Sequence, residues 1–215
     1  MHAFVRRHTR FLLVAACAIA GAASTARAAD PQADAREIVR GMADTVIATL
    51  AKGRDKAGRE AVFGELYRKN FDNAGIGAWA AGRAYTAASP AQQKAYLAVL
   101  ETYIVKAYAY QLTRYKGERL RVSDAEADTA GARQDVIVIS HLVHPDPRES
   151  REIEMRWRLH KVGDRLLVSD VVIDKISMAL TEKRAFTDWL HDRGSTLEGL
   201  TAKLREKIAD IDKKD

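Results

Sequence analysis

The sequence predicts an α+β fold, in which a curved, four-stranded antiparallel sheet is wrapped by about six helices and encloses an apolar cavity. Apolar residues recur at helical spacings up to residue 115, alternate with polar residues over 120–173, and return to helical spacing after residue 176. Helices followed by strands and then by helices are typical of the α+β class. Because such a sheet has one face to bury and the helices offer more apolar surface than a flat contact needs, we expect it to curve around a pocket.

The first 28 residues predict a secretory signal peptide. Three arginines within the first ten positions precede an apolar run over residues 11–20, and Ala26 and Ala28 have the spacing that signal peptidase reads. The run is shorter than the roughly 18 apolar residues that a membrane-spanning helix needs. We expect cleavage after Ala28; a lipoprotein anchored through Cys17 is the alternative.

Cleavage changes the charge balance of the chain. Four of the 35 Lys and Arg residues lie in the first 28 positions and none of the 29 Asp and Glu residues does, so the net charge falls from +6 to +2. The single cysteine is also removed, so the remaining chain cannot form a disulfide and depends on its core for stability. We expect residues 29–215 to form one domain, monomeric and periplasmic, with no nucleic acid as partner.

The first half of the chain predicts four helices. Asp30 and Pro31 are typical of a helix start, and the first helix runs to Gly53. Two shorter helices follow over 55–68 and 73–81. The longest begins at Ser89-Pro90 and covers residues 90–115; one of its faces is rich in tyrosine.

Strands are predicted after Gly117. Residues 120–122 alternate, 136–143 form a β-branched run, 153–159 alternate again, and 166–173 complete an antiparallel meander. Two helices then close the chain, one over residues 176–192 and one that begins after Ser195 as its cap.

Signatures of catalysis are absent from the sequence. It contains no GxxxxGK phosphate loop, no GxGxxG after a strand, no GxSxG elbow and no HExxH pair. His141 and His144 lie three residues apart near a strand end, where alternation places them on opposite faces, so we expect no metal site. Asp170 and Asp174 flank the apolar end of the fourth strand, and we expect them in local caps or turns.

A basic cluster lies where the longest helix gives way to the first strand. Arg114, Lys116 and Arg119 belong to it, and such a group could contact phosphates. Glu118 and Asp124 lie among these cations, so we interpret the cluster as a solvated polar face.

Several short motifs, in their order along the chain, resemble the MlaC family, also called the toluene-tolerance auxiliary family. The resemblance covers essentially the whole chain after residue 28. The motifs are Asn70-Phe71-Asp72, Gly82-Arg83-Ala84-Tyr85, the segment from Ser89 to Gln93, the segment from Tyr115 to Glu118, the segment from Val168 to Asp174, and Leu197-Glu198-Gly199-Leu200. The chain departs from the family by having Lys175 where Gly is usual and Lys183 where Arg is usual.

This resemblance implies a periplasmic lipid carrier rather than an enzyme. Members of the family have a cone-shaped, NTF2-like fold and hold phospholipid acyl chains in an apolar cavity, without a cofactor. They pass the lipid between an outer-membrane lipoprotein complex and an inner-membrane ABC transporter complex, which maintains outer-membrane lipid asymmetry.

On this interpretation the lipid-binding residues come from the long helix and from the second and third strands. The alternation of the second strand is equally compatible with Ile137, Ile139 and Val143 facing inward. The predicted lining residues are Tyr103, Ala107, Tyr108, Val136, Val138, Leu142, Ile153, Met155, Trp157 and Leu159.

Three other functions remain open at this point. The cargo could be a hopanoid or another isoprenoid lipid. The fold could host isomerase or hydrolase chemistry with Asp170 as a buried acid, or the protein could be an adaptor whose core is filled.

Overall fold

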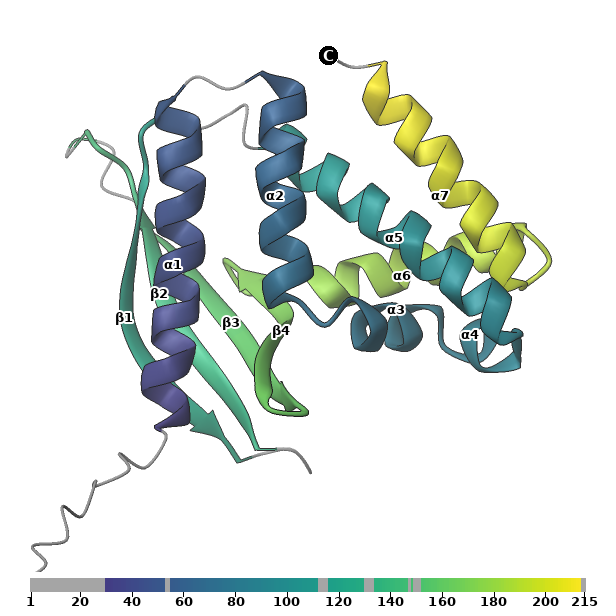
Figure 1. The fold of residues 1–215 in the computed structure, drawn as a ribbon, viewed down its shortest axis with the longest axis horizontal. Helices are drawn as coiled ribbons and strands as arrows, with labels where there is room; N and C mark the ends of the chain where they lie inside the picture. The colour runs from purple at the N-terminus through teal and green to yellow at the C-terminus, as the bar shows by residue number, and fades with distance from the viewer. Residues whose placement is uncertain are drawn as a thin grey trace, which may run out of the picture.

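Seven helices and a five-stranded sheet make up the described part of the protein (Figure 1). The computed structural model describes residues 30–52, 55–111, 116–129, 134–146, 148 and 152–213, and the predicted signal peptide lies outside them. The helices are α1 (Pro31–Ala51), α2 (Lys56–Asn70), α3 (Asn73–Ala81), α4 (Arg83–Ala87), α5 (Pro90–Gln111), α6 (Met178–Asp192) and α7 (Leu197–Asp212). The strands are β1 (Arg119–Asp128), β2 (Asp135–Val143), β3 (Ile153–Val162), β4 (Arg165–Ile173) and β5 (Ile176–Ser177).

The sheet is an antiparallel meander in the order β1-β2-β3-β4-β5, so the prediction of four strands was wrong by one. The additional strand arises because Asp174 and Lys175 both have positive φ angles, 47° and 71°. Two such residues form the tight turn that matches the twist of a hairpin, and Ile176 pairs with Ile173. A helix from residue 176 was therefore also wrong: α6 begins at Met178.

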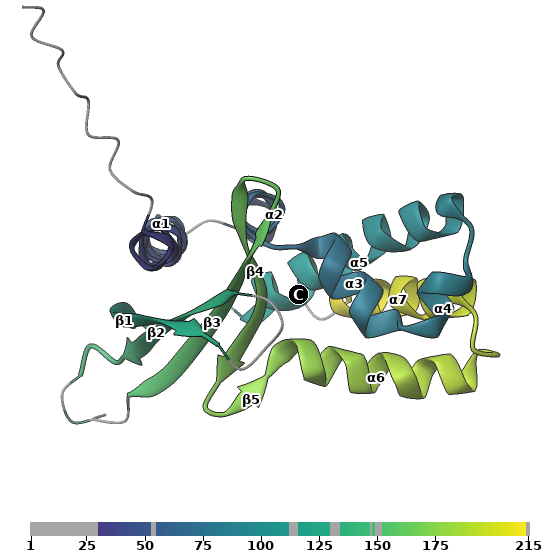
Figure 2. The same cartoon turned by 90° about the horizontal axis from the view of Figure 1, so that it is seen from below.

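Helix α1 lies across one face of the sheet, over β1 and β2 (Figures 1 and 2). The register pairs Val136 with Leu159 and Val138 with Trp157, so these side chains share that face. Register shifts between Val122 and Asp124 in β1, and opposite the junction of Arg158 and Leu159, are the bulges that bend such a sheet. The buried residues between α1 and the sheet are Ala35, Val39, Met42, Ala125, Val136, Val138, Leu159 and Val168.

The outer edge of β4 is covered by the segment between α2 and α3. Phe71 forms a bridge with Val168, and the N–H of Asp72 donates to the carbonyl of Val168 at 3.0 Å. The Asp72 carboxylate accepts from the N–H of Gly75 at 2.9 Å, which caps α3, and lies 3.0 Å from Nε2 of the buried His160. This contact closes the strand edge that β5 leaves open.

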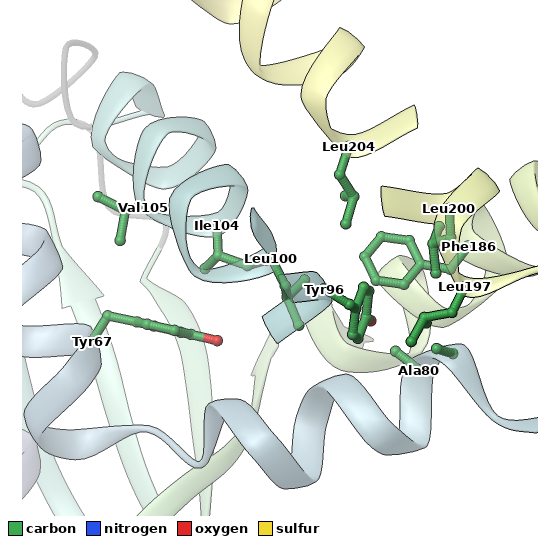
Figure 3. Close-up of a cluster of buried hydrophobic side chains, with 11 residues drawn as sticks. Tyr67, Ala80, Tyr96, Leu100, Ile104, Val105, Phe186, Leu197, Leu200 and Leu204 are labelled. Carbon is green, nitrogen blue, oxygen red and sulfur yellow. The ribbon is translucent and has the colours of Figure 1, made fainter. Parts of the chain in front are cut away.

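A second core lies among the helices beyond β4, on the opposite side from β1 (Figure 2). Helix α5 packs against α2 and α7, and α3 packs against α6. Tyr96, Leu100, Phe186, Leu200 and Leu204 meet there, all nearly or fully buried (Figure 3). The molecule thus has one core under α1 and another among α3, α5, α6 and α7.

The cap of α7 also differs from its prediction. Thr196 has the extended backbone of a cap residue, and its hydroxyl accepts from the N–H of Gly199 at 3.1 Å. Ser195 has a φ of 59°, so it continues the turn after Gly194 instead.

Candidate functional site

A pocket of about 500 Å³ lies between the two cores, bounded by α1, α2, α5, α6 and the sheet. For scale, an engineered apolar cavity of about 150 Å³ in another protein holds a benzene molecule. The lining is overwhelmingly apolar and includes Met42, Val46, Ile47, Leu50, Phe63, Leu66, Tyr67, Phe71, Ile76, Ile104, Tyr108, Leu120, Leu142, Ile153, Met155, Trp157, Val171, Ile173 and Met178.

The pocket continues the core beneath α1. Along α1 the apolar stripe begins with the fully buried Ala35 and Val39, reaches the pocket at Met42, and continues there through Val46 and Leu50. These spacings of three and four residues keep all five side chains on one face of the helix. The same stripe therefore fills the core at its first half and lines the pocket at its second.

Strands β2 and β3 also contribute to the core at one end and to the pocket at the other. On β2, Val138 is buried in the core while Leu142 lines the pocket; on β3, Leu159 is buried while Met155 and Ile153 line the pocket. Leu142 pairs with Ile153, so the two strands present one continuous wall. The pocket begins where the sheet and α1 stop interdigitating.

The predicted lining residues divide into two groups. Tyr108, Leu142, Ile153, Met155 and Trp157 line the pocket. The structure places the other five elsewhere: Val136, Val138 and Leu159 in the core on the same face of the sheet, Tyr103 against the helical core, and Ala107 at a partly buried position of α5 outside the described lining.

The sequence reasoning missed the lining from α1, α2, β4 and α6. Val46 and Leu50 belong to a helical stripe that was visible in the sequence, but such a stripe is equally typical of ordinary core packing. Phe63 and Met178 gave no pattern that distinguishes a pocket from a core.

Aromatic pairs stiffen the wall that α2 and α5 provide. Phe63 stacks on Tyr108 with ring centroids 6.3 Å apart, and Tyr67 stacks on Phe71 at 5.0 Å. Burial raises the pKa of both tyrosines, so their hydroxyls stay neutral. The Tyr67 hydroxyl donates to Oδ1 of Asn73 at 3.1 Å, which fixes its ring at the pocket wall.

Asp170 is used structurally. Its carboxylate accepts from the Ser177 hydroxyl at 2.6 Å and from the N–H of Ala179 at 3.0 Å, so it holds the first turn of α6. This agrees with the capping role expected for it. Asp174 lies in the turn between β4 and β5, also as expected.

Glu182 is a partly buried carboxyl that was not among the residues expected from the sequence to line the pocket. It lines the pocket from α6, and the Tyr103 hydroxyl donates to its Oε2 at 3.4 Å. Burial raises the pKa of Glu182, and the hydrogen bond from Tyr103 opposes that shift only in part.

The described residues contain no group of three or more His, Cys, Asp or Glu side chains arranged to hold a metal. His141 and His144, the pair considered from the sequence, are both only partly exposed, and Nδ1 of His144 accepts from the N–H of Asp146 at 3.1 Å. In the same part of the chain, no helix is long and apolar enough to cross a bilayer.

Comparison with known proteins identifies the family. A model of the MlaC protein family matches residues 40–206, which is most of the chain. This protein belongs to the MlaC family. A solved structure of a phospholipid-binding protein from Ralstonia solanacearum, in complex with a phospholipid, is 24% identical and has a TM-score of 0.67; the match covers 85% of this chain and 99% of that chain. The MlaC-family chain described here shares that fold.

Proposed function

We propose that this MlaC-family protein is a periplasmic carrier that holds phospholipid acyl chains in the pocket between α1, α2, α5, α6 and the sheet. It would receive and deliver the lipid at an outer-membrane lipoprotein complex and an inner-membrane ABC transporter complex. The observation that carries this proposal is the pocket itself, about 500 Å³ of space with an almost wholly apolar wall. The family and the phospholipid complex of the structural neighbour support it.

The energetics of lipid transfer explain why such a pocket is needed. Burial of one methylene is worth about 0.8 kcal/mol, so two chains of about 15 methylenes resist transfer into water by about 24 kcal/mol. Free diffusion across an aqueous space is then negligible. A pocket that restores most of this energy makes exchange between membrane and protein nearly balanced, and therefore reversible in both directions.

The side chains that line the pocket suit flexible cargo. Met42, Met155 and Met178 lie on three different elements around the pocket. Methionine is unbranched and polarisable, so it adapts to chains of different length and unsaturation. We propose that Tyr108, Leu142, Ile153, Met155 and Trp157 contact the chains, whereas Tyr103, Ala107, Val136, Val138 and Leu159 support that wall from outside it.

Mass spectrometry of organic extracts tests the proposal. Protein purified from its own periplasm is expected to carry phospholipid at a fixed molar ratio. The absence of any stoichiometric lipid would count against a carrier, and a polycyclic isoprenoid in place of phospholipid would assign the pocket to that cargo.

A charged residue in the wall tests the location. Met155→Lys places an ammonium group in the pocket, and the copurified lipid is expected to fall to a small fraction of the wild-type amount. Val162→Lys is the matched control, because Val162 lies on the same strand and is 42% exposed. Full lipid occupancy in a folded Met155→Lys variant would remove this wall from the binding site.

A further inference from the structure

The charged side chains among the described residues that line the pocket are all acidic. Among the described lining residues there are three carboxylates, Glu118, Asp170 and Glu182, and no Lys, Arg or His. They come from three separate segments: the residue before β1, strand β4 and helix α6. A group taken into the pocket therefore meets negative charge from more than one side.

Glu182 is the least compensated of the three. It accepts from the Tyr103 hydroxyl at 3.4 Å, which is long for a hydrogen bond between two oxygens. Within the described part of the chain it forms no ion pair. Lys183, the adjacent cation, turns away: its Nζ donates to the carbonyl of Trp79 at 3.0 Å and lies 4.2 Å from the centre of that ring.

Asp170 adds a fixed negative charge nearby. Its carboxylate accepts two hydrogen bonds at the start of α6, from the Ser177 hydroxyl and from the Ala179 N–H. These donors are not available to an anion in the pocket.

The consequence for cargo follows from electrostatics in an apolar space. An anion that enters loses its hydration and finds no cation among the described lining residues, while the carboxyls around it repel it. A neutral group loses less hydration energy than an anion, and the carboxyls do not repel it.

We propose that Glu182 is a specificity-determining residue, which makes the pocket reject amphiphiles whose anionic head would enter it, free fatty acids among them, and keeps the phosphate of a bound phospholipid outside. This rests on the proposed function, since it presumes that acyl chains occupy the pocket. The acidic lining thus selects double-chain lipids, whose charged head stays in water, over single-chain anions that are small enough to enter completely.

Three amphiphiles with the same alkyl chain test this: hexadecanesulfonate, hexadecanol and hexadecylammonium, whose heads are anionic, neutral and cationic. Their affinities are measured by displacement of a fluorescent phospholipid from the delipidated full chain near neutral pH. The wild-type protein is expected to bind the sulfonate at least about tenfold more weakly than the alcohol. In Glu182→Gln the ratio of these two affinities is expected to move about tenfold toward unity, and affinity for the ammonium ion is expected to fall.

Glu65→Gln, an exposed carboxylate on α2, is the matched control and is expected to keep the wild-type ratio. If wild-type protein does not bind the fluorescent phospholipid, the proposed function fails. If it does bind, but takes up sulfonate as tightly as alcohol, or if Glu182→Gln leaves the ratio unchanged, only the charge selection fails. If Glu182→Gln does not fold, the wild-type protein still tests the acidic lining, which is contradicted if sulfonate binds as tightly as the ammonium ion.

Discussion

Alanine substitutions at two positions on one face of β3 distinguish a residue of the filled core from a residue that lines the pocket. Leu159 is 0% exposed and lies beneath α1, whereas Met155 is partly exposed and lines the pocket four residues away. Leu159→Ala leaves a void in close-packed surroundings, so we expect a loss of about 3 kcal/mol in the free energy of unfolding. Met155→Ala enlarges space that is already open, so we expect about 1 kcal/mol or less in the lipid-free protein.

For lipid affinity we expect the opposite order: Met155→Ala should have the larger effect and Leu159→Ala the smaller one. Met155→Ala removes a contact surface equivalent to roughly two methylenes, or about 1.6 kcal/mol, so phospholipid affinity should fall roughly tenfold. Leu159→Ala leaves the pocket wall in place and should change affinity much less.

Urea unfolding of the delipidated variants gives the first quantity, and displacement of a fluorescent phospholipid gives the second. Equal unfolding slopes in urea would show that both variants remain comparably folded. The reasoning is refuted if Met155→Ala destabilises the lipid-free protein as much as Leu159→Ala, because Met155 would then lie in a filled core.

Four further outcomes are expected. Lys175→Gly should raise the free energy of unfolding by about 1 kcal/mol, because the φ of 71° strains a lysine and not a glycine; a less stable variant in urea would contradict this. Gly77→Ala should cost about 2 kcal/mol, because its Cβ would lie 2.6 Å from Cδ2 of Leu97; thermal melts measure the loss, and wild-type stability would show that the packing yields. Thr196→Ala should cost about 1 kcal/mol through the lost cap of α7, where a Ser195→Ala control should not lose a cap. Burial raises the pKa of Glu182 above its usual 4.5, so the folded state binds this proton more tightly and the free energy of unfolding should fall as pH rises from 4.5 to the folded pKa; Glu182→Gln should abolish that part of the pH dependence, and identical profiles for both proteins would contradict it.

The turn after β4 shows how a local departure from the sequence prediction arose. Lys175 stands where the resemblance to the MlaC family predicted glycine, and the run after it was assigned to a helix. The chain nevertheless forms the tight turn and pairs Ile176 with Ile173 before α6 begins. Pairing with an existing strand outweighs the unfavourable backbone of one lysine, and that pairing is invisible to local periodicity.

The sequence by itself determined the order and type of nearly all helices and strands, but it left open which face of the second strand is buried. Periodicity and caps depend on neighbours within four residues. Asp30 therefore predicted the start of α1, and the alternation of residues 153–159 predicted β3.

Only the tertiary structure decided where the apolar surface is filled and where it is open. Val39 and Val46 belong to one stripe of α1, yet the first is buried in the core and the second lines the pocket. The difference depends on how far the sheet bends away from α1, which follows from bulges and packing across the whole chain. The contact between Tyr103 and Glu182 joins residues 79 positions apart, and it involves one of the three carboxylates that line the pocket.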